Sequence, residues 1–160
     1  MIEEILISKD RLSILIGKNG EIKKDIEEKT KTDITINDEV RISGEAINIM
    51  DAKNIITAIG RGFSPEIAMR LLEDDMNLCV ISLPHDRKIL IRIKSRIIGT
   101  GGKCRKTIEK LTNTSISVYG KTVSVIGLYE DVELTREAIE KLIMGSPHKN
   151  VYRFLETHCD

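Results

Sequence analysis

The opening stretch of the chain combines a strand-like run with two helical periods. Residues 3–8 form a short, β-branched apolar run of strand length. A short helix is predicted over residues 10–17. Beyond it, Ile22 and Ile26 recur with helical spacing, and the polar residues around them extend this second helix to about Lys31. The pattern therefore predicts one strand followed by two helices.

The next segment changes to the period of a β-hairpin. Residues 33–37 and 39–43 alternate apolar with polar side chains about a short turn at Asn37 and Asp38. A final helix is predicted over residues 45–60, because apolar residues recur on one of its faces. The predicted order is β-α-α-β-β-α.

The same pattern occurs twice along the chain. Shifting the sequence by 82 residues aligns residues 15–36 with residues 97–118. Glycines, basic residues, threonines and isoleucines coincide, and Glu27 falls on Glu109. One extra residue in the turn at 119–122 then changes the offset to 83. The repeat implies two copies of one unit, each about 70 residues long.

The second copy repeats the order of elements, with one ambiguous segment. A strand is predicted over residues 77–83 and a last helix over 130–144. Residues 89–93 fit a strand or a helix by pattern alone, and the register of the repeat favours a helix. A tail helix follows, with Ser146 as N-cap and Pro147 as its first residue.

A connecting helix is predicted between the copies. Gly60 and Gly62 interrupt the preceding helix, Ser64 is the N-cap and Pro65 begins the new one. The fold class is therefore α+β, with two units, a connecting helix that packs them together and a C-terminal helix. The expected boundaries are 1–62 for the first unit, 63–75 for the connecting helix, 76–145 for the second unit and 146–160 for the C-terminal helix.

Charge is distributed unevenly between the two copies. The 160 residues are 41% hydrophobic and 31% charged, a globular composition, with a formal net charge of zero. Residues 1–75 hold 11 Lys and Arg against 16 Asp and Glu, and residues 76–160 hold 14 against 9, so the halves carry −5 and +5. Residues 87–110 contain nine basic residues and one acid, Glu109. This basic segment surrounds the second glycine cluster and indicates an anion site there.

Several classes of protein do not fit the sequence. No stretch approaches the roughly 20 apolar residues of a membrane span, and the acidic N-terminus does not resemble a signal peptide, so we expect a cytoplasmic protein without membrane contact. Cys79, Cys104 and Cys159 form no C-x-x-C pair, and His158 lacks further ligands, so neither disulfides nor a metal site is expected. No catalytic Ser/His/Asp or Cys/His arrangement is visible. We therefore expect no enzymatic activity and no cofactor.

Residues 17–20 and 99–102 share the pattern G-x-x-G. A Walker A loop is not matched, because the residue five before Gly102 is Ile97 and Cys104 stands where a magnesium-binding hydroxyl is needed. Neither cluster reads G-x-G-x-x-G, and the βαβ alternation of dinucleotide-binding folds is missing. A G-x-x-G turn between two helices instead lets the backbone approach a phosphodiester chain, while the next helix directs its free amides at the phosphates.

Both copies resemble the type I KH domain, whose G-x-x-G loop clamps about four backbone nucleotides. The resemblance rests on "IGKNG" and "IGTGG", each with a basic residue three positions after its last glycine, within the order β-α-α-β-β-α. It implies an apolar groove for the bases between the helix pair and the following strand. The matching groove residues are Ile16, Ile22 and Ile34 in the first copy and Ile98, Cys104 and Ile116 in the second. The aromatic content of 3% suits an aliphatic groove better than an aromatic stacking platform.

The tandem arrangement, with a basic second copy reading "RIIGTGGKCRKTIEKLTNTSISVYG", resembles the Dim-two-type ribosome-biogenesis factors. This resemblance implies binding to single-stranded RNA near the 3′ end of small-subunit (16S-type) ribosomal RNA during late maturation, mainly through the second KH domain. It also implies a PIN-domain endonuclease of the Nob-one type as partner, with other ribosome-assembly or translation proteins. Eukaryotic members carry a long N-terminal extension, whereas the first strand here begins at residue 2, which favours an archaeal source.

Two features depart from the KH pattern. Gly101 stands where KH loops often carry a polar residue, which predicts a more flexible loop with one phosphate ligand fewer, and Arg96 or Lys103 is expected to compensate. The first copy keeps a complete "GKNG" but has acids such as Glu21 and Asp25 around its loop, so it is expected to face either RNA or a protein. The alternative function is an interaction scaffold whose KH domains contact only proteins. Salt dependence of RNA binding separates these readings.

The predicted RNA-binding residues follow from these motifs. In the second copy they are Arg96, Ile98, Gly99, Thr100, Gly101, Gly102, Lys103, Cys104, Arg105, Lys106 and Ile116. The candidate second site in the first copy consists of Ile16, Gly17, Lys18, Asn19, Gly20, Ile22, Lys23, Lys24 and Ile34.

Overall fold

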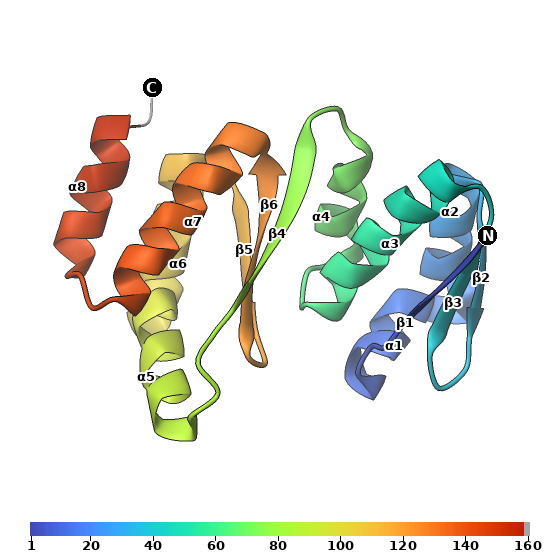
Figure 1. Ribbon diagram of the computed structural model, residues 1–160, viewed down its shortest axis with the longest axis horizontal. Coiled ribbons are helices and arrows are strands. Elements are labelled where there is room, and N and C mark those ends of the chain that lie inside the picture. The colour runs from blue at the N-terminus through green and yellow to red at the C-terminus, as the bar shows by residue number, and fades with distance from the viewer. Residues whose placement is uncertain (159–160) are drawn as a thin grey trace. The chain divides into compact units, whose positions relative to one another are not determined.

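A computed structural model describes residues 1–158 of the chain (Figure 1). The chain forms two compact units, Met1–Asp74 and Asp75–Asp160. Each unit folds in the predicted order β-α-α-β-β-α, with a 3-10 turn at its glycine loop. The expectation for Cys159 falls outside the described residues.

The repeated part of the first unit has three helices, α1 to α3, and one three-stranded antiparallel sheet, in which β3 lies between β1 and β2. The helix α3 packs against the strands β1 and β3 and against both preceding helices. The elements are β1 (Ile2–Ile5), α1 (Lys9–Ile16), α2 (Glu21–Thr30), β2 (Asp33–Ile36), β3 (Val40–Ser43) and α3 (Ala46–Gly60).

The register of the first sheet explains its alternating sequence. Ile36 pairs with Val40, so the hairpin loop contains the three residues 37–39. Val40 and Ile42 are fully buried, whereas Arg41 between them is exposed and forms an ion pair with Glu4 on β1 at 2.9 Å. The apolar face of β3 therefore lies against the helices, and its polar face is paired across the sheet.

The segment after α3 contains the helix α4 (Pro65–Met69), followed by a 3-10 turn over Arg70–Leu72. The hydroxyl of Ser64 accepts a hydrogen bond from the Ile67 amide at 3.3 Å, and Pro65 is the first helical residue, as the sequence predicts. Both pieces pack against α3, within the first unit.

The second unit has the same topology, with β6 between β4 and β5. Figure 1 shows α5, α6 and α7 on one side of this sheet, with α8 lying outside α6 and α7. The elements are β4 (Met76–Ser82), α5 (Arg87–Ile98), α6 (Lys103–Thr112), β5 (Ser115–Tyr119), β6 (Thr122–Leu128), α7 (Tyr129–Ile143) and α8 (His148–His158).

The ambiguous segment at residues 89–93 is part of the helix α5, as the register of the repeat predicts. A local signal also favours a helix, because the Asp86 carboxylate accepts hydrogen bonds from the amides of Lys88 and Ile89, both at 3.1 Å. An acidic N-cap of this kind satisfies amides that have no intrahelical partner. Ile93 and Ile97 then point into the core.

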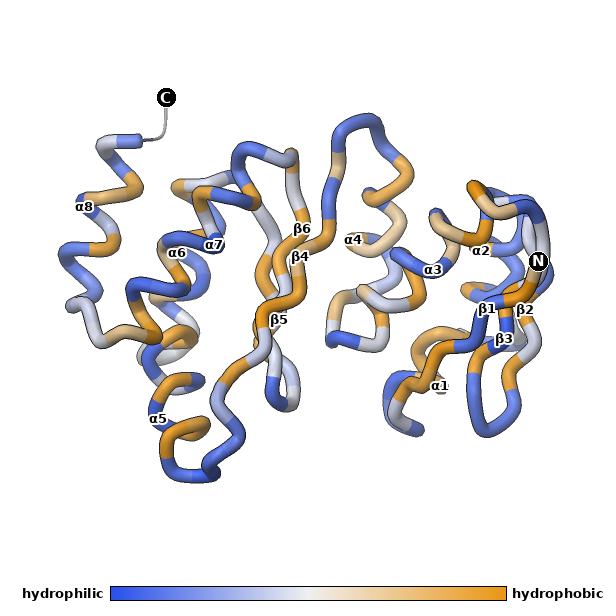
Figure 2. The backbone as a smooth tube through the Cα atoms, in the orientation of Figure 1, coloured by the Kyte–Doolittle hydropathy of each residue, from blue (hydrophilic) through white to orange (hydrophobic). Residues whose placement is uncertain are grey.

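The tail helix α8 buries Val151 and Leu155 completely. In Figure 2 its trace alternates between hydrophobic and hydrophilic residues, as expected of a helix covered on one side. It begins at His148, one residue later than predicted. The predicted N-cap, Ser146, directs its carbonyl to the Arg96 guanidinium, and the Pro147 carbonyl instead accepts the first helical bonds, from residues 150 and 151 at 3.0 and 3.2 Å.

Candidate nucleic-acid interface

The two glycine loops have the same backbone conformation. Three residues in each loop have positive φ, in the same order and with nearly equal values. They are Gly17 (73°), Asn19 (57°) and Gly20 (75°) in the first unit and Gly99 (75°), Gly101 (62°) and Gly102 (78°) in the second. Both loops therefore present their backbone in the same way, whatever the intervening side chains.

Glycine is required at the first position of each loop. A Cβ at Gly99 would lie 2.8 Å from both the Cβ and the amide nitrogen of Cys104, and a Cβ at Gly17 would clash with the Ile22 side chain. The combination of φ 75° and ψ 174° at Gly99 is also one that residues with a Cβ scarcely adopt. The missing side chain brings the loop close to the first turn of the following helix.

Gly101 is under a weaker constraint. A Cβ there would meet nothing within 4 Å, and Asn19 adopts the corresponding conformation in the first unit. Asparagine tolerates left-handed backbone better than most residues. Glycine at position 101 thus leaves the tip of the second loop without a side chain, although the sequence could hold a polar one there.

The loop leads directly into the N-terminus of α6. Gly102 is the N-cap of this helix and offers no side chain to its first amides, and Gly20 has the same place before α2. The N-terminal end of a ten-residue helix, with its positive dipole end, therefore faces the loop in each unit. This is the arrangement that suits a backbone phosphate.

The exposed face of α6 carries a row of lysines, which we call the lysine face: Lys103, Lys106 and Lys110. Their spacing of three and four residues places them on one side of the helix, and no salt bridge of theirs occurs within residues 1–158. The corresponding residues of α2 are Glu21, Lys24 and Glu28. The same face is thus cationic in the second unit and acidic in the first.

Two of the predicted basic ligands are engaged by a carboxylate. The Arg105 guanidinium pairs with Glu109 at 2.9 Å, and Lys23 pairs with Glu27 at 3.1 Å in the first unit. Their charge is therefore partly neutralised. The free positive charge beside the second loop comes from the lysine face, of which Lys110 was not among the predicted site residues.

Arg96, on α5, directs its side chain to the turn between α7 and α8. Its guanidinium donates to the carbonyls of Leu142, at 3.4 Å, and of Ser146, while its own carbonyl is 2.8 Å from Nε2 of His148. These contacts hold three chain segments together. Arg96 thus has hydrogen-bond partners within the fold, and its role as a phosphate ligand stays a prediction.

The predicted groove residues differ in their exposure. In the second unit Ile98 is half-buried, whereas Cys104 and Ile116 belong to the core at 1% and 4% exposure. In the first unit Ile16 is 36% exposed, Ile22 is half-buried and Ile34 is buried. Ile16, Ile22 and Ile98 therefore offer an accessible apolar surface, and the buried members of the set form the floor beneath it.

The helix α8 covers Cys104. Burial raises the pKa of this thiol, against the smaller lowering effects of a hydrogen bond with Tyr152 and of the charge of Arg96. The thiol therefore stays protonated at neutral pH, which makes it a poor nucleophile. Cys104 is a packing residue beneath the loop.

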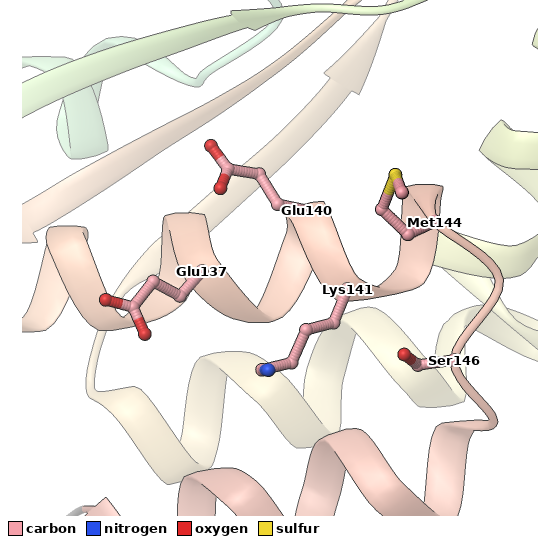
Figure 3. Close-up of a pocket in the computed structure, with 5 residues that line it drawn as sticks. All are labelled: Glu137, Glu140, Lys141, Met144 and Ser146. Atoms are coloured by element: carbon pink, nitrogen blue, oxygen red, sulfur yellow. The ribbon is translucent and has the colours of Figure 1, made fainter.

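Of the two surface pockets described next, one lies outside the predicted RNA-binding sites and the other overlaps the candidate site of the first unit. Figure 3 shows one along α7, lined by Glu137, Glu140, Lys141, Met144 and Ser146, none of which was predicted to bind RNA. Lys141 lies over the Phe154 ring at 4.7 Å, and Glu140 pairs with Arg136 at 2.8 Å. A second pocket lies on the acidic face of α2 and includes Ile22 and Lys24.

Two further searches cover the described part of the chain only. Within residues 1–158, no group of three or more His, Cys, Asp or Glu side chains is arranged to hold a metal ion. Over the same residues, no helix has both the length and the apolar character needed to cross a membrane.

Besides Lys110, sequence reasoning missed the acid that both repeats keep. Glu109, on α6, accepts hydrogen bonds from Arg105 and from an amide of β5, and Glu27 does the same with Lys23 and an amide of β2 in the first unit. The alignment of the two copies contained the signal, because Glu27 falls on Glu109.

Comparisons with known proteins agree with this geometry. Residues 78–159 match the model of the eukaryotic type KH domain (KH-domain type I), and residues 2–58 match that of the KH domain. A KH domain-containing protein of Methanocaldococcus jannaschii is 42% identical over 97% of this chain and 73% of its own length. The RNA-binding protein pno1 of Dictyostelium discoideum is 32% identical over 71% of this chain, which spans about half (49%) of that relative's length.

Two solved structures from Pyrococcus horikoshii OT3 are similar to the chain. One is the crystal structure of Dim2p, with 46% identity, a TM-score of 0.91 and coverage of 99% of each chain. The other is the complex of a/eIF2alpha, aDim2p and rRNA, with 46% identity, a TM-score of 0.90 and coverage of 98% of this chain and 93% of that one.

Proposed function

Since the chain belongs to the type I KH-domain family, with PNO1 and Dim2 proteins among its relatives, we propose that it binds single-stranded RNA, mainly through its second KH domain. The observation that carries this proposal is the junction of the second glycine loop with α6. There an open loop, an uncapped helix N-terminus and the lysine face converge.

Each part of this junction has a role toward a phosphodiester chain. The loop backbone can approach the RNA because Gly101 and Gly102 carry no side chains, and the first amides of α6 point at the RNA phosphates. The lysine face supplies long-range attraction and releases counterions on binding. The half-buried Ile98 offers the apolar surface on which a base rests.

The proposed RNA is the 3′ end region of small-subunit ribosomal RNA, bound during ribosome maturation. Support comes from the resemblance to Dim-two-type factors and from the similar aDim2p, whose solved complex contains rRNA. By the same resemblance, a PIN-domain endonuclease of the Nob-one type is a proposed partner. The site as described carries no arrangement for catalysis of its own, and we expect neither RNA cleavage nor nucleotide turnover.

The first KH domain is proposed to face a protein. Its loop has the same backbone as the second, but its α2 carries Glu21 and Glu28 where α6 carries lysines. Acidic side chains beside the loop repel a phosphate backbone. The solved complex of the similar aDim2p also contains a protein, a/eIF2alpha.

The test is fluorescence anisotropy with a short single-stranded RNA matching the 3′ end of small-subunit rRNA, at two salt concentrations. The variant Thr100→Asp/Gly101→Asp places two acids at the tip of the second loop. Position 101 accommodates a side chain, as Asn19 shows, so the fold is retained. The matched variant in the first loop is Lys18→Asp/Asn19→Asp.

We expect the second-loop variant to lose RNA binding and the first-loop variant to bind within about twofold of the wild type. Loss in the first-loop variant alone would reverse the assignment of the two domains. Undiminished binding in both variants, or wild-type binding without salt dependence, would support the protein scaffold instead.

A further inference from the structure

One carboxylate joins the two walls of the proposed nucleotide site. The Oε1 atom of Glu109, on α6, accepts a hydrogen bond from the Arg105 guanidinium at 2.9 Å. Its Oε2 atom accepts one from the backbone amide of Ile116, on β5, at 2.8 Å. Both contacts are short and charge-assisted, which makes them stronger than neutral hydrogen bonds.

The amide of Ile116 would otherwise be unpaired within the sheet. Because β6 is the central strand, β5 is an edge strand, and half of its amides point away from the sheet. Amides of this kind are available to a ligand or to water. Glu109 takes the one at Ile116, so this amide is withdrawn from hydrogen bonding with RNA and is used to hold the strand against the helix.

The first unit repeats this bridge with a different cation. Glu27 pairs with Lys23 at 3.1 Å and accepts the amide of Ile34, on β2, at 2.8 Å. Glu27 is present although the face of α2 that corresponds to the lysine face carries Glu21 and Glu28. Its function therefore depends on the framework of the domain rather than on the charge of the surrounding surface.

We propose that Glu109 is a positioning residue for RNA, which fixes the separation of α6 and β5 through the Ile116 amide and so sets the width of the site between them. This inference rests on the proposed function of the second domain. Glu109 also draws Arg105 onto the helix surface, which leaves the lysine face as the cationic contact for phosphates.

The test separates the amide contact from the charge pair. Glu109→Gln keeps an acceptor for the Ile116 amide and loses the ion pair with Arg105, whereas Glu109→Met has similar length and loses both. Glu109→Asp is a second variant, whose shorter side chain cannot reach the strand and the arginine together. Glu27→Met, which removes the corresponding bridge from the first unit, is the matched control.

All variants are titrated with the same single-stranded RNA as the wild type, and thermal unfolding is recorded for each. We expect Glu109→Met and Glu109→Asp to weaken binding about tenfold, the loss that corresponds to one charge-assisted hydrogen bond. Glu109→Gln should bind within about threefold of the wild type, and Glu27→Met should bind normally although its unit loses as much stability.

Three results would overturn the inference: normal binding by Glu109→Met, an equal loss in Glu109→Gln, or an equal loss in Glu27→Met. The wild type answers a separate question in the same titration. If it fails to bind RNA, the proposed function itself fails. If it binds and Glu109→Met binds equally well, only the role of Glu109 is rejected.

Discussion

At the scale of single residues, the second loop is built on an asymmetry between its glycines. Gly99 combines a backbone conformation reserved for glycine with a position at which an added Cβ would clash with Cys104 in the first turn of α6. Gly101 needs only a left-handed conformation, which Asn19 adopts in the first unit. The motif G-x-x-G therefore contains one steric requirement that sequence alone does not reveal.

This difference predicts the effect of substitutions on stability. Gly99→Ala should destabilise the second unit by about 1–3 kcal/mol, because the backbone is strained and the new Cβ meets Cys104. Gly101→Asn should change stability by less than about 0.5 kcal/mol. Urea unfolding followed by circular dichroism measures both values, and equal losses would show that the two glycines serve the same purpose.

A second prediction concerns the tyrosine that covers Cys104. The pKa of Tyr152 is raised to about 12, mainly by burial and to a smaller extent by a hydrogen bond with Cys104. Because this value lies above that of the unfolded chain, the neutral phenol stabilises the fold fully below about pH 10, and the contribution disappears as pH rises toward about 12. Wild-type protein should therefore lose more thermal stability in this window than Tyr152→Phe.

Tyr129→Phe is the control for this measurement, since Tyr129 is 61% exposed and takes no part in the core. It should follow the wild type across the alkaline range. A decline in Tyr152→Phe as steep as in the wild type would mean that other groups cause the alkaline loss.

At the scale of elements, α2 and α6 are equivalent helices with the same buried face and different exposed faces. Their buried positions agree, with Ile26 matching Ile108 and Thr30 matching Thr112 in the two cores. Their exposed positions disagree, because two glutamates replace two lysines of the lysine face. The buried positions thus keep the two helices alike, and the exposed charges of each helix determine which kind of ligand can bind beside it.

Exchanging the exposed charges tests this view. Lys103→Glu/Lys110→Glu gives α6 the charge pattern of α2 without touching the core. We expect RNA affinity to fall at least about tenfold, and the slope of log affinity against log salt to decrease by about 1.4, or 0.7 for each lost phosphate contact. An unchanged slope would show that the lysine face does not meet the RNA.

Arg96 is also cationic, but its contacts predict an effect on stability and none on the salt dependence of RNA binding. Arg96→Met should lower the free energy of unfolding by about 1–3 kcal/mol, because it leaves the carbonyls at the turn before α8 without their donor. The salt slope of RNA binding should stay as in the wild type. A smaller slope would restore Arg96 as a phosphate ligand.

Sequence patterns predicted the elements well because periodicity and repetition are local properties. Residues 89–93, undecided by pattern, were assigned correctly through the register of the repeat. The contacts between elements could not be predicted in this way. The bridge from Glu109 to Ile116, the covering of Cys104 by α8 and the engagement of Arg96 all join segments that only the folded chain brings together.

At the scale of the whole molecule, one domain design appears twice with separate specialisations. Both units keep the topology, the loop conformation and the bridge from an acid to the edge strand. They differ in net charge, −5 for residues 1–75 and +5 for residues 76–160, and in the helix that follows the shared order, which is α4 in the first unit and α8 in the second. The two copies thus share one framework and differ in the charge of their surfaces, which is the basis for the proposal that they bind different partners.

This division predicts the stoichiometry of RNA binding. Under conditions where RNA is in excess of the dissociation constant, we expect one short RNA per chain, because the acidic face of α2 disfavours a second. Titration with labelled RNA, with mass measured by light scattering, determines the ratio. Glu21→Lys/Glu28→Lys should raise it toward two, since the first loop already has the backbone geometry of the second. Two RNAs bound to the wild type would mean that loop geometry outweighs the charge around it.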